Sequence, residues 1–219
     1  MNIRYPIYEG VYRILTIKCN VTINGIVSRT ASMRTNKEGK SYIGFAVKTT
    51  IPAKAGGCKQ VEIFVSKDGT DAELPSYVVG QRIGLKGVLT FRKREENLYF
   101  NFHAESVDFL PENERDAIEG TIKFRGTVGK QVEEKRDKRG NPHWVFSAFS
   151  TEKHEENFSF TWVRFICFTA EKDGWLQPKA RICAKGVLEL SVYLDKINLS
   201  CRVEEMREWV KPAVTGCNE

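Results

Sequence analysis

Several ingredients of common catalytic and metal sites are missing from this chain. It has only three histidines, and none of its six cysteines forms a C-x-x-C pair or stands at zinc-ligand spacing from a histidine. No G-x-S-x-G motif and no phosphate-cradling glycine loop is present, and no nucleophile–base pair can be assembled from the scattered histidines. The sequence therefore predicts a protein that is not an enzyme and that uses no metal or cofactor.

Long apolar runs are also absent. No stretch of about 18 apolar residues could span a membrane, and residues 1–6 lack the apolar core of a secretion signal. Four of the cysteines fall inside apolar, strand-like segments, where buried free thiols are the simplest interpretation. We therefore expect a cytoplasmic protein in a reduced compartment.

What the chain does have is an ordinary globular composition with an excess of basic residues. Its 219 residues are 41% hydrophobic and 28% charged, which suits one large or two small domains. The net charge of +6 and the pI of about 9.0 favour a polyanionic partner such as nucleic acid.

Internal repetition is the strongest organisational signal. Segment 82–89 recurs as segment 181–188 with six of eight residues identical, at an offset of 181 − 82 = 99 positions. The glycine-centred strand pattern around Gly25 recurs around Gly126, at an offset of 126 − 25 = 101. Offsets near 100 along the whole chain indicate a duplicated unit.

Each copy contains five segments with apolar residues at every second position, the spacing of β-strands. A glycine near the middle of each first strand favours a bulge where a long strand bends. Between the third and fourth strands, segments 74–79 and 175–179 leave room for a helical turn. The expected strands are 17–30, 41–50, 60–66, 81–92 and 98–109, then 118–132, 142–151, 160–169, 180–190 and 197–209.

These elements predict an all-β protein made of two tandem OB-folds, which are five-stranded Greek-key barrels. A pair of small β-sandwiches is the alternative architecture. The expected division is an N-terminal extra strand or hairpin (1–16), a first barrel (17–110), a polar linker (111–117), a second barrel (118–211) and a short tail (212–219).

The third strand of the second copy carries the most informative pattern. In segment 161–168, alternation puts Trp162, Arg164 and Phe168 on the face opposite the core. Flat rings with a cation between them suit unstacked bases, because rings stack on bases and the guanidinium can hold a phosphate. A strand buried on both faces is the alternative interpretation.

Further candidate residues lie in loops that flank the binding groove of OB-folds, where basic residues would contact phosphates. Solvated hairpin tips are the alternative for all of these loops. Two ring candidates of the first copy, Tyr42 and Phe64, lie instead on its second and third expected strands. The basic candidates are Arg29, Arg34, Lys37 and Lys40 in the first copy, Arg92, Lys93 and Arg94 between its last two strands, and Lys130 and Arg139 in the second copy.

With these motifs in place, the chain resembles the bacterial single-stranded-DNA-binding protein (SSB-like) family, including its relative primosomal replication protein N. The resemblance rests on Trp162-x-Arg164 with Phe168, and on the repeated Lys-Gly-Val-Leu of strands four. It implies a homodimer that presents four OB units. The chain departs from the family in two ways. The first copy has Gln60, Glu62 and Phe64 on the matching face, so the family's Trp and Arg are not kept there, and the family's acidic C-terminal tip is missing.

The expected function is therefore the binding of single-stranded DNA with little sequence specificity, by base stacking and phosphate contacts. Replication, recombination or repair would be the setting, at the nucleoid, and the missing acidic tip favours a phage, mobile-element or accessory version. The alternatives are an OB-fold module that binds another protein through its aromatic face and a protein that binds RNA.

Overall fold

The computed structural model describes residues 17–53, 56–94, 97–154, 157–169 and 171–210. The expected N-terminal strand or hairpin (1–16) and the expected tail (212–219) lie outside these ranges. Within them the chain is almost entirely strand, with one short 3₁₀ helix, η1 (Asp71–Ser76), at one of the two predicted helical turns.

The ten predicted strands are confirmed, each within a few residues of its expected bounds. Period-two patterns place strands well because one face of each is buried against a core. The strands are β1 (Ile17–Thr35), β2 (Ser41–Pro52), β3 (Cys58–Lys67), β4 (Arg82–Arg94), β5 (Asn97–Phe109), β6 (Ala117–Arg136), β7 (Pro142–His154), β8 (Asn157–Cys167), β9 (Arg181–Tyr193) and β10 (Lys196–Glu208).

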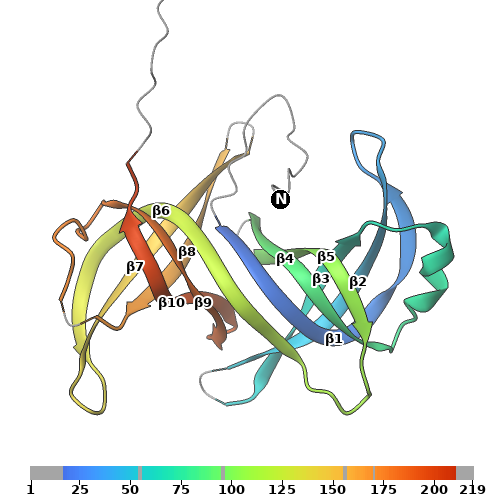
Figure 1. The fold of residues 1–219 in the computed structure, drawn as a ribbon, viewed down its shortest axis with the longest axis horizontal. Helices are drawn as coiled ribbons and strands as arrows, with labels where there is room; N and C mark the ends of the chain where they lie inside the picture. The colour runs from blue at the N-terminus through green and yellow to red at the C-terminus, as the bar shows by residue number, and fades with distance from the viewer. Residues whose placement is uncertain (1–16, 54–55, 95–96, 155–156, 170, 211–219) are drawn as a thin grey trace, which may run out of the picture.

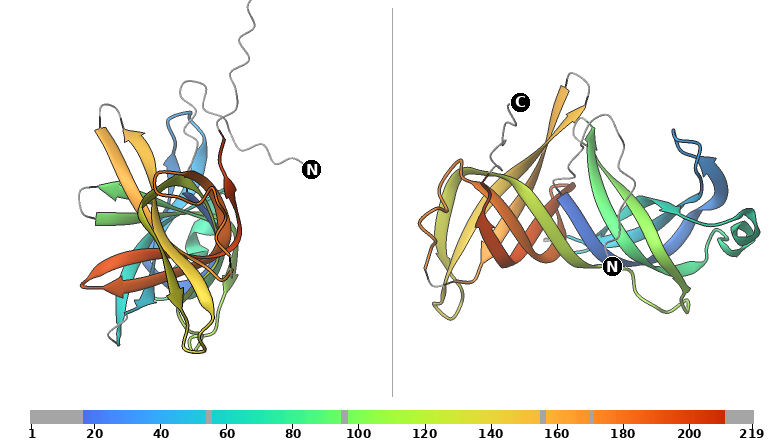
Figure 2. Two further views of the ribbon diagram at one scale, coloured as in Figure 1. Left: turned by 90° about the vertical axis from the view of Figure 1, so that its left-hand side faces the viewer. Right: turned by 45° about the horizontal axis from the view of Figure 1, so that its top comes forward.

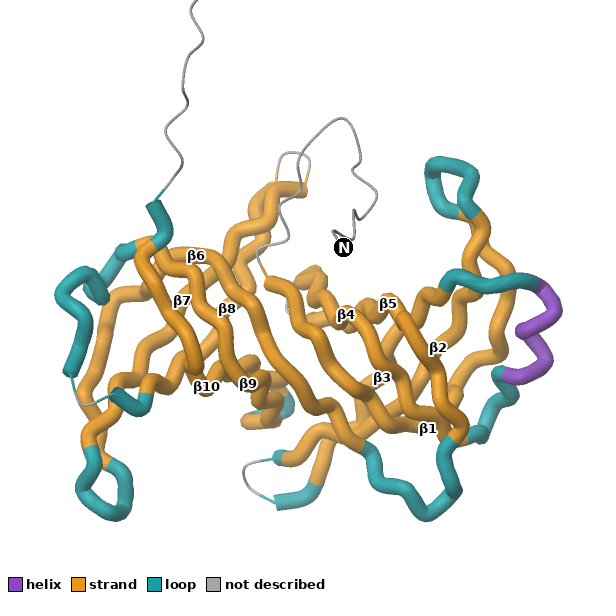
Figure 3. Tube along the Cα trace, viewed as in Figure 1, coloured by secondary structure: helices purple, strands orange, loops and turns teal. Residues whose placement is uncertain are grey.

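Each set of five strands closes on itself. In the first half the pairings run β1-β2-β3-β5-β4 and return to β1, and in the second they run β6-β7-β8-β10-β9 and return to β6. All pairs in these two circles are antiparallel except β3–β5 and β8–β10, which are parallel. Two closed five-stranded barrels of OB-fold order stand side by side (Figures 1 and 3). The alternative of two β-sandwiches is wrong, because the first strand of each unit pairs with both its second and its fourth.

The bend in each first strand lies slightly beyond the predicted glycine. The register of β1 against β2 shifts between Val27 and Ser32, and that of β6 against β7 shifts between Val128 and Val132. Gly25 and Gly126 do not form the bulges themselves. A Cβ on Gly25 would lie 2.5 Å from the Lys48 carbonyl oxygen, and a Cβ on Gly126 would lie 2.2 Å from the Phe149 carbonyl oxygen. The glycines let the second strand approach closely, and the bulge follows.

The two barrels are joined by direct pairing of their first strands. β1 runs antiparallel to β6, from Ile17 opposite Phe124 to Asn24 opposite Ala117, which makes one continuous ten-stranded sheet. Most of the buried apolar side chains of both barrels belong to one hydrophobic cluster. The molecule is therefore two barrels around one connected core.

Three further contacts hold the barrels together. The Lys59 ammonium on β3 donates to the carboxylate of Asp195, 2.7 Å away, in the β9–β10 turn. Ala53 forms a parallel bridge with Val192 of β9. At the linker, Arg82 and Asp116 form an ion pair of 2.7 Å that is 13% and 17% exposed, and it ties the start of the second unit to the first barrel.

The cysteines within the described residues are free. Cys19, Cys167 and Cys201 are buried as predicted, whereas Cys183 is half-buried and Cys58 is exposed. Burial raises the pKa of the Cys167 thiol to about 11 and that of Cys201 to about 12, so both stay protonated near neutral pH.

Neither a metal centre nor a membrane-crossing helix is found in the described part of the chain. No group of three or more His, Cys, Asp or Glu side chains there could hold a metal ion. None of the helical segments in those ranges has the length and apolar character needed to cross a membrane.

The junction between the barrels yields a test at Gly120. This residue has φ +151°, and a Cβ on it would lie 2.2 Å from the Asn20 carbonyl oxygen and 2.7 Å from Val21 Cα of β1. Gly120→Val should separate β1 from β6 and lower the free energy of unfolding by about 2 kcal/mol or more, since backbone atoms must move. Urea unfolding monitored by circular dichroism measures this loss. Gly174→Val is the control, because nothing lies within 4 Å of its Cβ position; equal stability of the two variants would contradict the close approach.

Candidate nucleic-acid interface

The alternation predicted for the third strand of the second barrel is confirmed. Val163 and Phe165 are fully buried, whereas Trp162 is 51% exposed and Arg164 is also exposed. The interpretation as a strand buried on both faces is therefore wrong for this part of β8. Within the described residues, Arg164 makes no hydrogen bond or ion pair, so its guanidinium is free to meet a ligand.

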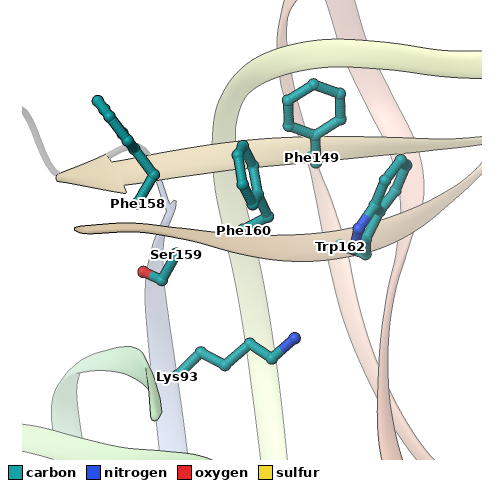
Figure 4. A pocket seen from close by; sticks show the side chains of 6 residues that line it. All are labelled: Lys93, Phe149, Phe158, Ser159, Phe160 and Trp162. Atoms are coloured by element: carbon teal, nitrogen blue, oxygen red, sulfur yellow. The ribbon is translucent and has the colours of Figure 1, made fainter. Parts of the chain in front are cut away.

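Four rings gather on the outer face of β7 and β8. Trp162 stands directly opposite Phe149 of β7, with their ring centroids 5.0 Å apart, and Phe160 meets the edge of Phe149 at 5.6 Å. Phe158 and Phe160 continue the same row at 59% and 44% exposed. We call Phe149, Phe158, Phe160 and Trp162 the aromatic row (Figure 4).

Three of these rings were not among the predicted site residues. Phe160 stood at the first position of the expected strand 160–169, whereas Phe158 lay outside it, because β8 begins at Asn157. Both residues extend the outward series of Trp162 toward the start of the strand. The period-two spacing of 158, 160 and 162 was a usable signal. Phe149 carried none, because its position beside Trp162 depends on the register between β7 and β8.

The aromatic row borders a groove of about 540 Å³ that both barrels form. Lys93 of β4, in the first barrel, lines its other side and reaches across from the rings of the second (Figure 4). The ends of β4 and β8 lie close enough for this because the two barrels are joined side by side (Figure 2). Lys93, predicted from a basic loop, is thus brought to the aromatic residues by the tertiary structure.

Two smaller residues shape the groove. A Cβ on Gly129 of β6 would lie 3.2 Å from the Trp162 indole, so the glycine leaves room for that ring to rest against the first strand of its barrel. Ser159 also lines the groove, and its Oγ is buried without a hydrogen-bond partner in the described residues. Such a hydroxyl is ready to bond a polar atom of a ligand.

Phe168 is exposed as predicted but lies away from this groove. It follows the end of β8, and its ring centroid is 5.4 Å from that of His143. Six residues of extended chain separate it from Trp162, roughly 20 Å. Arg164 lies between the two, so the outward face of β8 presents rings, a cation and then a second pair of rings.

The corresponding face of the first barrel is different in character. Glu62, which stands where the second barrel has Arg164, accepts hydrogen bonds from Arg29 at 2.6 Å and from Ser28 at 2.9 Å. Arg29 also lies 5.4 Å over the ring of Phe64, which is 38% exposed. Two predicted site residues, Arg29 and Phe64, are therefore brought together, but the charge of Arg29 is already offset by Glu62.

The remaining predicted residues are dispersed. The β1–β2 and β6–β7 hairpins project from opposite ends of the molecule, so their basic residues do not form one site (Figure 1). Lys40 pairs with Asp68 at 2.9 Å, and Tyr42 is half-buried. The side chain of Arg94 lies outside what the structure describes. Exposed side chains are found at Arg34, Lys37, Arg92, Lys130 and Arg139.

No family model and no curated protein matches this chain. Among solved structures, it is similar to the single-stranded DNA binding protein from Thermus aquaticus, with 18% identity, a TM-score of 0.45, and coverage of 90% of this chain and 96% of that one. The small single-stranded DNA-binding protein from Streptomyces coelicolor has 18% identity, a TM-score of 0.34 and coverage of 45% and 95%. The Plasmodium falciparum SSB, solved with ssDNA, has 16% identity, a TM-score of 0.34 and coverage of 45% and 99%. These proteins carry the name of the family that the sequence resembles.

The exposure of the aromatic row predicts an unequal pair of stability effects on one strand. Trp162→Ala should change the free energy of unfolding by about 1 kcal/mol or less, because the indole is half in water. Phe165→Ala, at a fully buried neighbour, should cost about 3–5 kcal/mol. Urea titrations of both variants measure the difference, and a Trp162→Ala loss as large as that of Phe165→Ala would show that the indole is a structural residue.

Proposed function

We propose that this chain binds single-stranded nucleic acid in the groove between the aromatic row and Lys93. The observation that carries the proposal is the solvent exposure of the aromatic row. Three large aromatic side chains on one strand are 44–59% exposed, although burial would be favourable by about 1.5–3 kcal/mol for a ring of this size. An apolar surface of this kind marks a contact site for a ligand or partner.

The arrangement suits a nucleic-acid strand better than a protein partner. Rings at every second position of β8 offer successive stacking faces, and stacking tolerates any base because every base has a π-face. Lys93 and Arg164 flank the rings, where a phosphate backbone would run past stacked bases. Lysine is depleted at the cores of protein interfaces, whereas Lys93 lines this groove opposite the rings.

DNA is the proposed polymer, with little sequence preference, and replication, recombination or repair is the proposed setting. The groove has many stacking surfaces and few fixed hydrogen-bonding groups with which to read base edges, which supports a low sequence preference. The homodimer with four OB units, implied by the family resemblance, and a location at the nucleoid remain predictions.

Oligo-dT titration tests the proposal. Binding at low salt should quench tryptophan emission, and Trp162→Ala should remove most of that quench and weaken binding by about 1–3 kcal/mol, or roughly 5- to 150-fold. Tyr193→Ala is the control, since Tyr193 is 58% exposed and lies outside the groove. Absence of any fluorescence change with either DNA or RNA at low salt would favour the protein-interaction module. Competition between dT and rU oligomers of equal length then identifies the polymer.

Lys93 provides a second, electrostatic test. If its ammonium holds one phosphate, Lys93→Gln should lower the slope of log K against log salt by about 0.7, the value expected for one lost contact with a single strand. Arg115→Gln, in the exposed linker, removes the same charge away from the groove. Identical salt slopes for the two variants would mean that Lys93 does not touch the strand.

A further inference from the structure

The groove of the aromatic row lies beside the point where β1 begins. Ile17, the first residue of β1, stands opposite Phe124 of β6. Three residues further along β6, Thr127 stands opposite Phe149 of the aromatic row. β1 and β7 lie on the same side of β6, because β9 pairs with its other side in this region. Measured along β6, the start of β1 is therefore roughly 10 Å from the aromatic row.

The opposite side of β1 leads to Lys93. β1 pairs with β4 up to Cys19 opposite Leu89, and β4 continues beyond that pair to Arg94. In this last part of β4, β5 pairs with one side, and no strand of the described chain pairs with the other. Lys93 belongs to this part and lines the groove (Figure 4). The chain therefore enters β1 between a strand side without a described partner and the aromatic row.

The segment that precedes β1 is rich in apolar and aromatic residues. We call residues 1–16 the N-terminal segment. Nine of its sixteen residues are hydrophobic, a larger share than the 41% of the whole chain, and three of them are Tyr5, Tyr8 and Tyr12. Such a segment is stabilised by contact with exposed rings, because both surfaces leave water and aromatic rings attract one another in edge and offset geometries. Its one acidic residue, Glu9, offers a carboxylate to the ammonium of Lys93.

The groove itself lacks what such a segment supplies. Phe158, Phe160 and Trp162 are 44–59% exposed, and the Oγ of Ser159 is buried without a hydrogen-bond partner in the described residues. The unpartnered side of β4 presents backbone polar groups that proteins usually cover with a loop or a further strand. Apolar side chains would cover the rings, and backbone groups of an extended segment would bond to the hydroxyl and to the strand side.

We infer that the N-terminal segment occupies this groove when no nucleic acid is bound, so that the chain's own segment competes with the strand for the aromatic row. The inference rests on the proposed function, which supplies the competing ligand. Sixteen extended residues reach at most about 50 Å, several times the distance from Ile17 to Phe149. The tether gives the segment a local concentration on the order of 1 mM, which favours it over the same segment of a second copy.

Substitution of the three tyrosines in the full chain tests the inference. The triple variant Tyr5→Ser, Tyr8→Ser, Tyr12→Ser should bind oligo-dT at low salt about 5-fold or more tightly than the unmodified chain, the lower end of the range for linked sites. The physical reason is that the apparent affinity rises with the fraction of molecules whose groove is open. Tyr193→Ser is the control, because it removes an exposed tyrosine outside the groove and should leave the affinity unchanged.

Tryptophan emission gives a second readout that needs no nucleic acid. Without the three rings the Trp162 indole should be more exposed to water, so the emission of the triple variant should move to longer wavelength. The same three substitutions made together with Trp162→Ala should produce no such shift. A synthetic peptide of residues 1–16, added to the triple variant, should reverse the shift and weaken oligo-dT binding.

The outcomes separate the inference from the proposed function. Equal oligo-dT affinity and equal emission of the triple variant and the unmodified chain would overturn the inference and leave the proposed function standing. Weaker binding by the triple variant would also overturn it, because the tyrosines would then belong to the strand-binding surface. An emission shift that disappears on dilution would assign the contact to a second copy, against the inference. If neither protein binds DNA or RNA but the shift is present, the proposed function fails and the contact of the segment with the groove stands.

Discussion

The antiparallel pairing of β1 with β6 is the constraint on which the rest of this molecule depends. It turns two closed barrels into one sheet around one core, and it requires backbone contact so close that Gly120 has no room for a side chain. Because the pairing fixes how the barrels sit, it also brings the end of β4 to the side of β8. The groove between Lys93 and the aromatic row exists only as a result of that placement.

The two copies have kept the same framework and diverged on its surface. Position for position, the outer face of β8 with its neighbour β7 has Trp162 beside Phe149, whereas the first barrel has Gln60 beside Thr50. The ion pair of Glu62 with Arg29 closes a site in the first barrel that Arg164 leaves open in the second. The first barrel therefore contributes support and a cation to the candidate site, and the second contributes the stacking surface.

The sequence by itself determined the duplication, the ten strands and the outward direction of Trp162 and Arg164. These follow from local periodicity, since alternation along a strand decides which side chains meet the core without reference to anything distant. The partners of those residues were decided by the tertiary structure. The β7–β8 register places Phe149 beside Trp162, and the pairing of the barrels places Lys93 beside the rings. Arg29 forms an ion pair with a carboxylate 33 residues away in the chain. Each depends on contacts between residues far apart in the chain, which no local pattern encodes.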